Sequence, residues 1–492
     1  MVSLALGVNF LATLFFSWTD LAEPSRYSLS AETRKVLEKL EAPIDIIVTI
    51  TENEDNPRLL KRFLHDLKFL LSSIEVESRF GKQVRIHYVN VFKHQDENKE
   101  IIKDYELKEN NQVLVACEDR VLDLFRFNDQ PIGNRNLGVQ TNGSSRNTRI
   151  FEYLASIGWY NDWEEDTLGR PVPRLFLGEE MLLRAIRKVS HEPEDALKAY
   201  FLVGHGEMEL TSWNETRGLS GMKSLLANLG VETGDFLLGS NKKVQEVPSD
   251  ADLVVIASPQ VRLSVEEARA LKSYLSVRHG SVMLLLDPVR GMEDHGLSSL
   301  LRPWGLSCDD MRLVEPAVEK SNLGRYKTSP YNRKDPHPIV SYLAKHIAIW
   351  YFPQASRGRP VFTRARSEEE GEGVTVSNLL SSSPESWAED EWRKPGIADN
   401  PTRRDAISNH PGPVPYAVAV ERKVRSKHGI NIPGGKLVVF GNSSIFCNLG
   451  LLQPGNQQLF YNTTHWMLDE EDFIGVPPKP LHRYKDDLKP EE

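Results

Sequence analysis

A histidine and a glutamate follow an apolar segment, KAYFLVG, within the sequence Gly204-His205-Gly206-Glu207. A histidine beside a carboxylate suits general acid–base chemistry, in which the carboxylate orients the imidazole. The same pair can ligate a metal ion, and Asp287, which ends another apolar segment, would supply a second carboxylate. The pattern therefore predicts one of two things. Either His205, Glu207 and Asp287 form a catalytic or ligand-binding site, or the segment is a tight glycine-flanked turn whose polar side chains bind backbone groups.

No residue has the sequence context of a catalytic nucleophile. Ser258 follows the apolar segment DLVVIA, but Pro259 comes next and removes the backbone N–H that an oxyanion hole would use. The cysteines are too far apart in sequence for a C-x-x-C redox pair or a local zinc site; they are Cys117, Cys308 and Cys447. The phosphate-binding patterns G-x-x-x-x-G-K-[ST] and G-x-G-x-x-G do not occur. We therefore expect a protein that is not an enzyme, that has no cofactor and that does not itself hydrolyse nucleotides.

The region 191–476 alternates apolar strands with helices. The expected strands end at Gly204, Ser258 and Asp287, and the expected helices cover 219–229 and 264–277. Continuous apolar strands separated by helices are typical of a parallel sheet that is covered on both faces and binds ligands at the carboxyl ends of its strands. We predict an α/β domain of the Rossmann-like or flavodoxin-like kind for this region.

The preceding region, 27–190, has a different order of elements. Strands are expected at 44–51, 84–91, 112–116 and 121–127, and helices at 31–40, 57–77, 99–105 and 179–189. This order is typical of a thioredoxin-like sandwich, although the first strand is followed by Thr51-Glu52-Asn53 without a cysteine. Residues 128–173 are rich in Asn, Gly, Ser and Arg and are predicted to form a loop insertion, and 477–492 a charged tail.

Residues 1–19 contain no charged side chain and have about the length that a membrane-spanning helix needs. A cleavable signal peptide would have a basic start and a small-x-small cleavage site, and this segment has neither. We therefore expect an uncleaved transmembrane anchor, with a buried helix of a soluble protein as the alternative. The chain as a whole is 26% charged with a formal net charge of −9, which argues against nucleic acid as a partner.

Several segments resemble a known family in their order and spacing. They are KAYFLVGHGE at 198–207, VPSDADLVVIASPQVRLSVEEARALKSYL at 247–275, VMLLLDP at 282–288, GPVPYAVAV at 412–420 and KLVVFGNSSIFCN at 436–448. With them the chain resembles the GldG-like, gliding-motility-associated auxiliary components of ABC-type transport systems. The resemblance implies a thioredoxin-like domain, then a class I amidotransferase-like domain without its catalytic triad, working beside an ABC permease and an ATPase. It supplies no catalytic residues for this chain.

The residues and the resemblance lead to one expectation and two alternatives. We expect a non-enzymatic, single-pass subunit of the bacterial cytoplasmic membrane, whose soluble domains lie outside the cytoplasm and contact a permease, an envelope component or a solute. The first alternative is a hydrolase-like enzyme that uses His205, Glu207 and Asp287. The second is a free-standing envelope binding protein.

Overall fold

The computed structural model describes the larger part of the chain. The described residues are 29–50, 58–78, 83–93, 98–126, 160–165, 171–190, 197–239, 246–289, 292, 294–314, 326–330, 336–341, 343, 349–351, 359–363, 373–382, 384, 386–390, 392, 410–425, 431–470 and 479–480. The chain divides into two compact units: unit 1 is Met1–Glu192 with Val476–Glu492, and unit 2 is Pro193–Gly475. The predicted anchor at 1–19 lies outside the described residues. None of the helices within those residues is long and apolar enough to cross a membrane.

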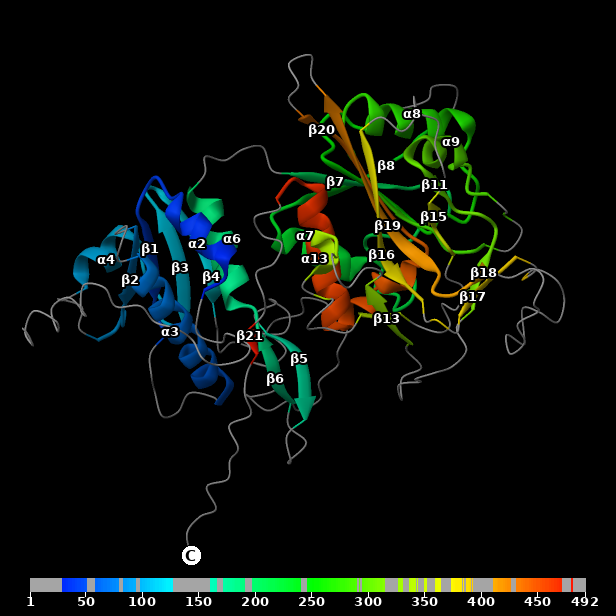
Figure 1. The fold of residues 1–492 in the computed structure, drawn as a ribbon. Coiled ribbons are helices and arrows are strands. Elements are labelled where there is room, and N and C mark those ends of the chain that lie inside the picture. Colours follow the sequence, from blue (N-terminus) through cyan, green and yellow to red (C-terminus); the bar gives the residue numbers. More distant parts are fainter. Residues whose placement is uncertain are drawn as a thin grey trace, which may run out of the picture. The chain divides into compact units, whose positions relative to one another are not determined.

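Unit 1 contains a four-stranded sheet with the order β2-β1-β3-β4 (Figure 1). Its elements are α2 (Ala31–Glu38), β1 (Ile44–Val48), α3 (Arg58–Ser78), β2 (Val84–Tyr88), α4 (Lys99–Asp104), β3 (Gln112–Cys117), β4 (Arg120–Arg126) and α6 (Gly178–Ser190). β1 is parallel to β2 and antiparallel to β3, and β3 and β4 form an antiparallel pair. These helices and strands confirm the elements that the sequence pattern predicts for this region.

The core of unit 1 lies on both faces of β1. Ile44, Ile46 and Val48 share one face and pack in a cluster with the apolar residues of α3 and α6. Ile47 faces the other way, into a smaller cluster that includes residues next to α4. All five residues of β1 are buried, which is why the strand is an almost continuous apolar run in the sequence.

Two predictions about unit 1 are wrong in part. The range expected to be a loop insertion, 128–173, contains β5 (Tyr160–Glu165) and the start of β6 (Pro171–Phe176). The range expected to be a charged tail contains β21 (Lys479–Pro480), which pairs with the end of β6. Prolines give β6 the composition of a loop, but they lie in the part of β6 that pairs with β5 alone, where a missing N–H is tolerated. β21 is too short to leave a sequence pattern.

Unit 2 contains a nine-stranded sheet with the order β14-β13-β16-β19-β20-β10-β9-β7-β8 (Figure 1). These strands are β7 (Lys198–Leu202), β8 (Glu232–Phe236), β9 (Leu253–Ala257), β10 (Ser281–Leu285), β13 (Tyr326–Pro330), β14 (Ile349–Tyr351), β16 (Val374–Ser381), β19 (Pro415–Arg425) and β20 (Asn431–Phe440). The half from β20 to β8 is parallel, whereas the half from β14 to β20 is antiparallel. Unit 2 is therefore an α/β fold with a mixed sheet.

The predicted parallel sheet is thus present as one half of a larger mixed sheet. The apolar strands between helices predict that half correctly. Each crossover helix returns the chain to the end of the sheet where the previous strand began, so the next strand runs in the same direction. β19 and β20 pair as neighbours with opposite directions, so their apolar runs look like parallel strands but belong to a hairpin. Short strands complete the unit: β11 (Leu306–Ser307), β12 (Arg312–Val314), β15 (Phe362–Thr363), β17 (Trp387–Glu389) and β18 (His410–Pro411).

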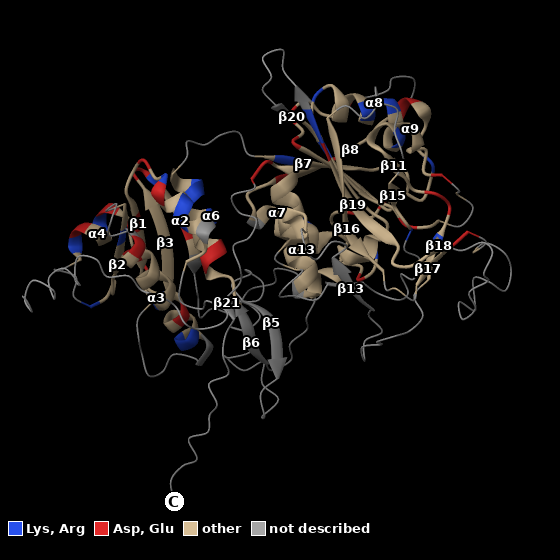
Figure 2. Cartoon of the chain, in the orientation of Figure 1, with Lys and Arg blue, Asp and Glu red and all other residues tan. Residues whose placement is uncertain are grey.

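Helices cover both faces of the parallel half. They are α7 (Ser220–Asn228), α8 (Val265–Ser276), α9 (Ser298–Leu301) and α13 (Pro454–Met467), with α10 (Pro338–Ser341) beside α13. Alternate residues of β9 pack with α7 and α13 on one side and with α8 and α9 on the other. β9 and β10 contain no charged residue, and α13, which packs on this half of the sheet, contains no Lys, Arg, Asp or Glu and is tan in Figure 2. This buried apolar layer fixes the positions at which the strands end.

Candidate functional site

Four parallel strands of unit 2 end at one edge of the sheet, and this edge carries the polar residues that the sequence singles out together with Ser443, which the sequence does not single out. They follow β7, β9, β10 and β20 and are, in that order, the His205–Glu207 turn, Ser258, Asp287 and Ser443. Open α/β sheets bind their ligands at this edge, so it is the candidate functional site.

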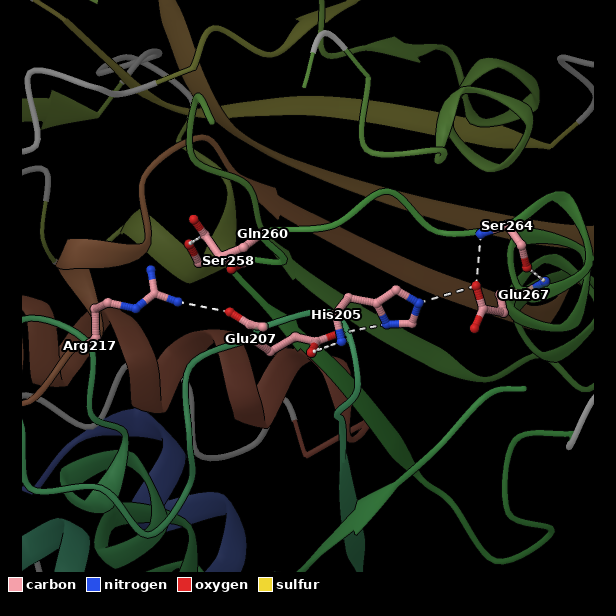
Figure 3. Close-up of polar contacts among 8 residues, drawn as sticks. His205, Glu207, Arg217, Ser258, Gln260, Ser264 and Glu267 are labelled. Carbon is pink, nitrogen blue, oxygen red and sulfur yellow. Dashed lines mark hydrogen bonds and ion pairs between the residues drawn. The ribbon is translucent and has the colours of Figure 1, made fainter. Parts of the chain in front are cut away.

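His205 contacts two carboxylates at once (Figure 3). Its Nδ1 lies 3.1 Å from Glu207 Oε1, and its Nε2 lies 3.2 Å from Glu267 Oε2 in the first turn of α8. The His205 backbone N–H also donates to Glu207 Oε2 at 2.7 Å. All three side chains are buried or nearly so, with His205 9% exposed. We call these three residues the histidine clamp, because they join the turn after β7 to α8.

Two glycines shape the turn that presents His205. Gly204 has a φ of 118° and Gly206 a φ of 73°, both in the region that favours glycine. A side chain at Gly206 would also come within 3.1 Å of the Gln260 side chain. The Arg217 guanidinium closes the turn by donating from Nη2 to the carbonyl oxygen of Gly206 at 2.9 Å (Figure 3).

The start of α8 positions Glu267, which the sequence reasoning missed as a site residue. Ser264 caps the helix: its Oγ accepts from the Glu267 backbone N–H, and its own N–H donates to Glu267 Oε2 at 2.7 Å. The S-x-x-E pattern at Ser264 is a sequence signal for this capping box. The second contact of Glu267, with His205, depends on how α8 packs on the sheet, which no local pattern encodes.

The clamp favours a charged histidine. Hydrogen bonding to Glu207 raises the pKa of His205, burial opposes this, and the charges of Glu267 and Glu207 raise the pKa further, so that it lies above its ordinary value. Burial alone would raise the pKa of Glu267, but its hydrogen bonds with Ser264 and the charge of His205 lower it overall. Both ring nitrogens of His205 face acceptors, so the imidazolium donates two hydrogen bonds.

Asp287 has different partners, so the three predicted residues His205, Glu207 and Asp287 do not form one hydrogen-bonded cluster. Asp287 Oδ2 accepts from the hydroxyls of Ser258, at 2.7 Å, and Ser443, and Asp287 Oδ1 accepts from the Ser443 N–H at 2.8 Å. The physical reason is the strand order: β9 lies between β7 and β10, so the ends of β7 and β10 are roughly 10 Å apart. Within the described residues, no group of three or more His, Cys, Asp or Glu side chains could hold a metal ion.

Ser258, Asp287 and Ser443 form a second cluster, which we call the Asp287 cluster, and Ser258 has no exposed surface. Its φ of 53° places it in the left-handed region, a strained conformation for a residue other than glycine. Its hydroxyl donates to Asp287, while the Gln260 side-chain amide donates to the same hydroxyl at 3.1 Å (Figure 3). This conformation places the Ser258 hydroxyl in a partly buried hydrogen-bond network that ties β9 to β10.

A second buried histidine lies behind this edge. The Arg359 side chain, which is fully buried, donates from Nη1 to His295 Nδ1 at 2.6 Å. Burial, and then the charge of Arg359, lowers the pKa of His295 to about 3. His295 is therefore neutral and holds its proton on Nε2, in contrast to the charged His205.

Comparison with protein-family models decides the family. Residues 197–473, more than half of the chain, match the family described as "ABC-type uncharacterized transport system". The chain belongs to this family. It is an auxiliary component of an ABC-type transport system, and the histidine clamp and the Asp287 cluster both lie within the matched residues. Residues 23–155 match a domain of unknown function (DUF7088).

Solved structures resemble this ABC transport auxiliary component only distantly. The "mmIFT52 N-terminal domain" has a TM-score of 0.36 and 16% sequence identity, covering 55% of this chain and 97% of that one. A ThuA-like protein from Bacteroides uniformis has a TM-score of 0.31 and 11% identity, covering 56% and 93% of the two chains. Comparison with curated proteins found no significant match.

The charged state of His205 gives the auxiliary component a pH dependence with a definite sign. The pKa of His205 is raised above its ordinary value of 6.5, so its contribution to stability is complete below about pH 6.5. That contribution should be lost as the pH rises through the higher pKa of the folded protein. We expect the difference in unfolding free energy between the wild type and His205→Gln, measured by denaturant unfolding, to be largest at mildly acidic pH and to shrink at alkaline pH.

The matched control is His279→Asn in the exposed turn after α8, where asparagine tolerates the positive φ of 57°. This variant should follow the wild-type pH profile. A His205→Gln difference that stays constant or grows with pH would contradict the charged clamp.

Proposed function

We propose that this auxiliary component is a non-enzymatic binding or scaffolding subunit of GldG-like type. In this proposal residues 1–19 anchor it in the bacterial cytoplasmic membrane, and its soluble units lie outside the cytoplasm. There they contact the permease, an envelope component or a solute.

The observation that carries the proposal is that the polar groups at this edge of the sheet form hydrogen bonds with one another. Both ring nitrogens of His205 face carboxylates, and the Ser258 hydroxyl is buried and donates to Asp287. A general base needs an accessible ring nitrogen, and a nucleophile needs an accessible oxygen. The histidine clamp and the Asp287 cluster instead stiffen the edge, as suits a surface that is recognised by a partner.

Unit 1 supports the same proposal. Its order of elements and its strand order β2-β1-β3-β4 fit a thioredoxin-like sandwich. Cys117 is buried in β3 rather than placed at the start of a helix, where a redox thiolate would be activated. We infer that unit 1 serves as a binding domain, like unit 2.

Affinity purification of the tagged, full-length protein in detergent, followed by mass spectrometry, tests the proposal. We expect an ABC permease and an ATPase to be recovered with the wild type, and to be lost when residues 1–19 are deleted. A third variant, in which an unrelated single-span helix replaces residues 1–19, separates tethering from docking by the anchor itself. Recovery of neither subunit with the wild type would contradict the proposal and favour a free-standing envelope binding protein.

A further inference from the structure

An exposed tryptophan lies on a loop of unit 2, and its side chain belongs to neither the histidine clamp nor the Asp287 cluster. Trp213 is 61% exposed, which is unusual for so large an apolar side chain. It lies in the segment Thr211–Arg217, which we call the tryptophan loop. The loop leaves the body of the unit next to an isolated bridge between Glu209 and Gly218.

Hydrogen bonds from a distant part of the chain hold the tryptophan loop in one shape. The Asn448 side-chain amide donates to the carbonyl oxygens of Ser212, at 3.0 Å, and Asn214, at 2.9 Å. The backbone N–H of Leu449 donates to the carbonyl oxygen of Glu215 at 2.9 Å. A side chain at Gly218 would come within 2.3 Å of the Ser212 oxygen, so the base of the loop is closely packed. The loop is therefore already ordered before any partner binds.

The surface around Trp213 combines apolar and acidic side chains. Leu452 is 69% exposed and belongs to the short helix that follows Leu449. The backbone N–H of Leu449 forms a hydrogen bond with the tryptophan loop. Glu209 and Glu215, on either side of Trp213 in sequence, are both exposed. The loop also contains Arg217, but its guanidinium donates to the backbone of the turn after β7. The surface thus offers an exposed indole together with two exposed carboxylates that lie within four residues of it in sequence.

We propose that the tryptophan loop is a docking site for a protein subunit of the same ABC-type transport system. The partner surface it fits is an apolar pocket for the indole with lysine or arginine at its rim, because Glu209 and Glu215 would face that rim. Tryptophan is the side chain most often found as an energetic anchor at protein interfaces, and an ordered loop loses little entropy on binding. This inference rests on the proposed function, since it names the surface through which the subunit meets its transporter.

The test uses the tagged, full-length protein and measures how much permease and ATPase are recovered with each variant. Trp213→Ala should weaken the association roughly 30-fold, the effect of losing an interface anchor. The matched control is Val277→Ala, which removes another exposed apolar side chain of the same unit, at the carboxyl end of α8. This control should bind as the wild type does. Thermal unfolding of both variants should match the wild type, since neither residue is buried.

Two further measurements identify the contact. A photo-crosslinking amino acid at position 213 should form a crosslink to a transporter subunit, and the same group at position 277 should not. The double variant Glu209→Gln with Glu215→Gln should bind more weakly than the wild type at low salt and lose most of the difference at high salt.

The outcomes separate this inference from the proposed function. If the wild type recovers the transporter subunits and Trp213→Ala recovers them equally well, the docking loop is wrong while the proposed function stands. A crosslink from position 213 to lipid alone would also overturn the docking loop. If the wild type recovers no transporter subunit, the proposed function and the docking loop fail together.

Discussion

Replacing His205 with alanine should lower the free energy of unfolding of unit 2 by about 3 kcal/mol, the cost of removing one partner from a buried ionic group. The substitution leaves Glu207 and Glu267 buried near each other without the imidazolium that lies between them. Each carboxylate keeps one backbone donor, from His205 itself and from Ser264, so the unit should still fold. The loss should concentrate at the turn after β7 and at the start of α8.

Denaturant unfolding of the full-length chain, followed by hydrogen exchange of peptides from β7, α8 and β9, measures this loss in unit 2 separately from unit 1. Arg217→Ala is the matched control, because it removes one exposed hydrogen bond to the same turn and should cost about 1 kcal/mol or less. His205→Gln should fall between the two, since its amide can donate to one carboxylate. A His205→Ala protein that keeps wild-type stability but loses association with a transported solute or substrate would show that the histidine acts on a ligand.

Gly441→Ala should destabilise unit 2 by about 3 kcal/mol or more, at the upper end of the cost of overpacking. Gly441 follows β20, accepts a hydrogen bond from the Arg359 backbone N–H and donates to the carbonyl oxygen of Tyr416. A Cβ atom at this position would lie 1.7 Å from the Arg359 carbonyl oxygen. Relief would require moving the segment that buries the Arg359 side chain against His295, so the clash cannot be absorbed by a side-chain rotation.

The same hydrogen-exchange measurement checks this prediction, with peptides from β10 and β20 as the reporters. Gly221→Ala in α7 is the matched control, because its Cβ would meet no atom closer than 3.3 Å and alanine favours the helix. We expect its stability to change by less than about 1 kcal/mol. Equal stability of the two variants would mean that the close approach of β20 and the Arg359 segment is not maintained in solution.

The sequence predicts the parallel half of the unit 2 sheet because its strands are buried on both faces. β9 and β10 are uncharged runs of apolar residues between helices, and such runs are typical of strands in a parallel sheet with both faces covered. The turn at Gly204 and Gly206 is likewise visible, since two glycines around one residue indicate a left-handed backbone. The sequence also places His205 beside Glu207, because two residues of one turn are close in any fold.

Contacts between separate segments are what the sequence does not predict. Glu267 reaches His205 only because α8 packs on the sheet in one register, and Asp287 meets Ser443 only because β20 lies next to β10. The sequence places His205 and Asp287 at the carboxyl ends of their strands but gives no strand order, so it does not reveal that β9 separates Asp287 from the turn after β7. The short pairing of β21 with β6 leaves no pattern at all, because two residues cannot show periodicity.

The strand order of unit 2 also has a consequence for the growing chain. β10 is complete at Leu285, but its neighbour β20 begins only at Asn431, near the end of the unit. Until β20 has been synthesised, the growing chain contains the uncharged strand SVMLL with one edge unpaired. Such an edge can form hydrogen bonds with other chains. Premature stop codons anywhere between these strands should therefore yield aggregated fragments rather than a smaller folded protein. Pairing of β10 along both of its edges thus depends on translation continuing as far as β20.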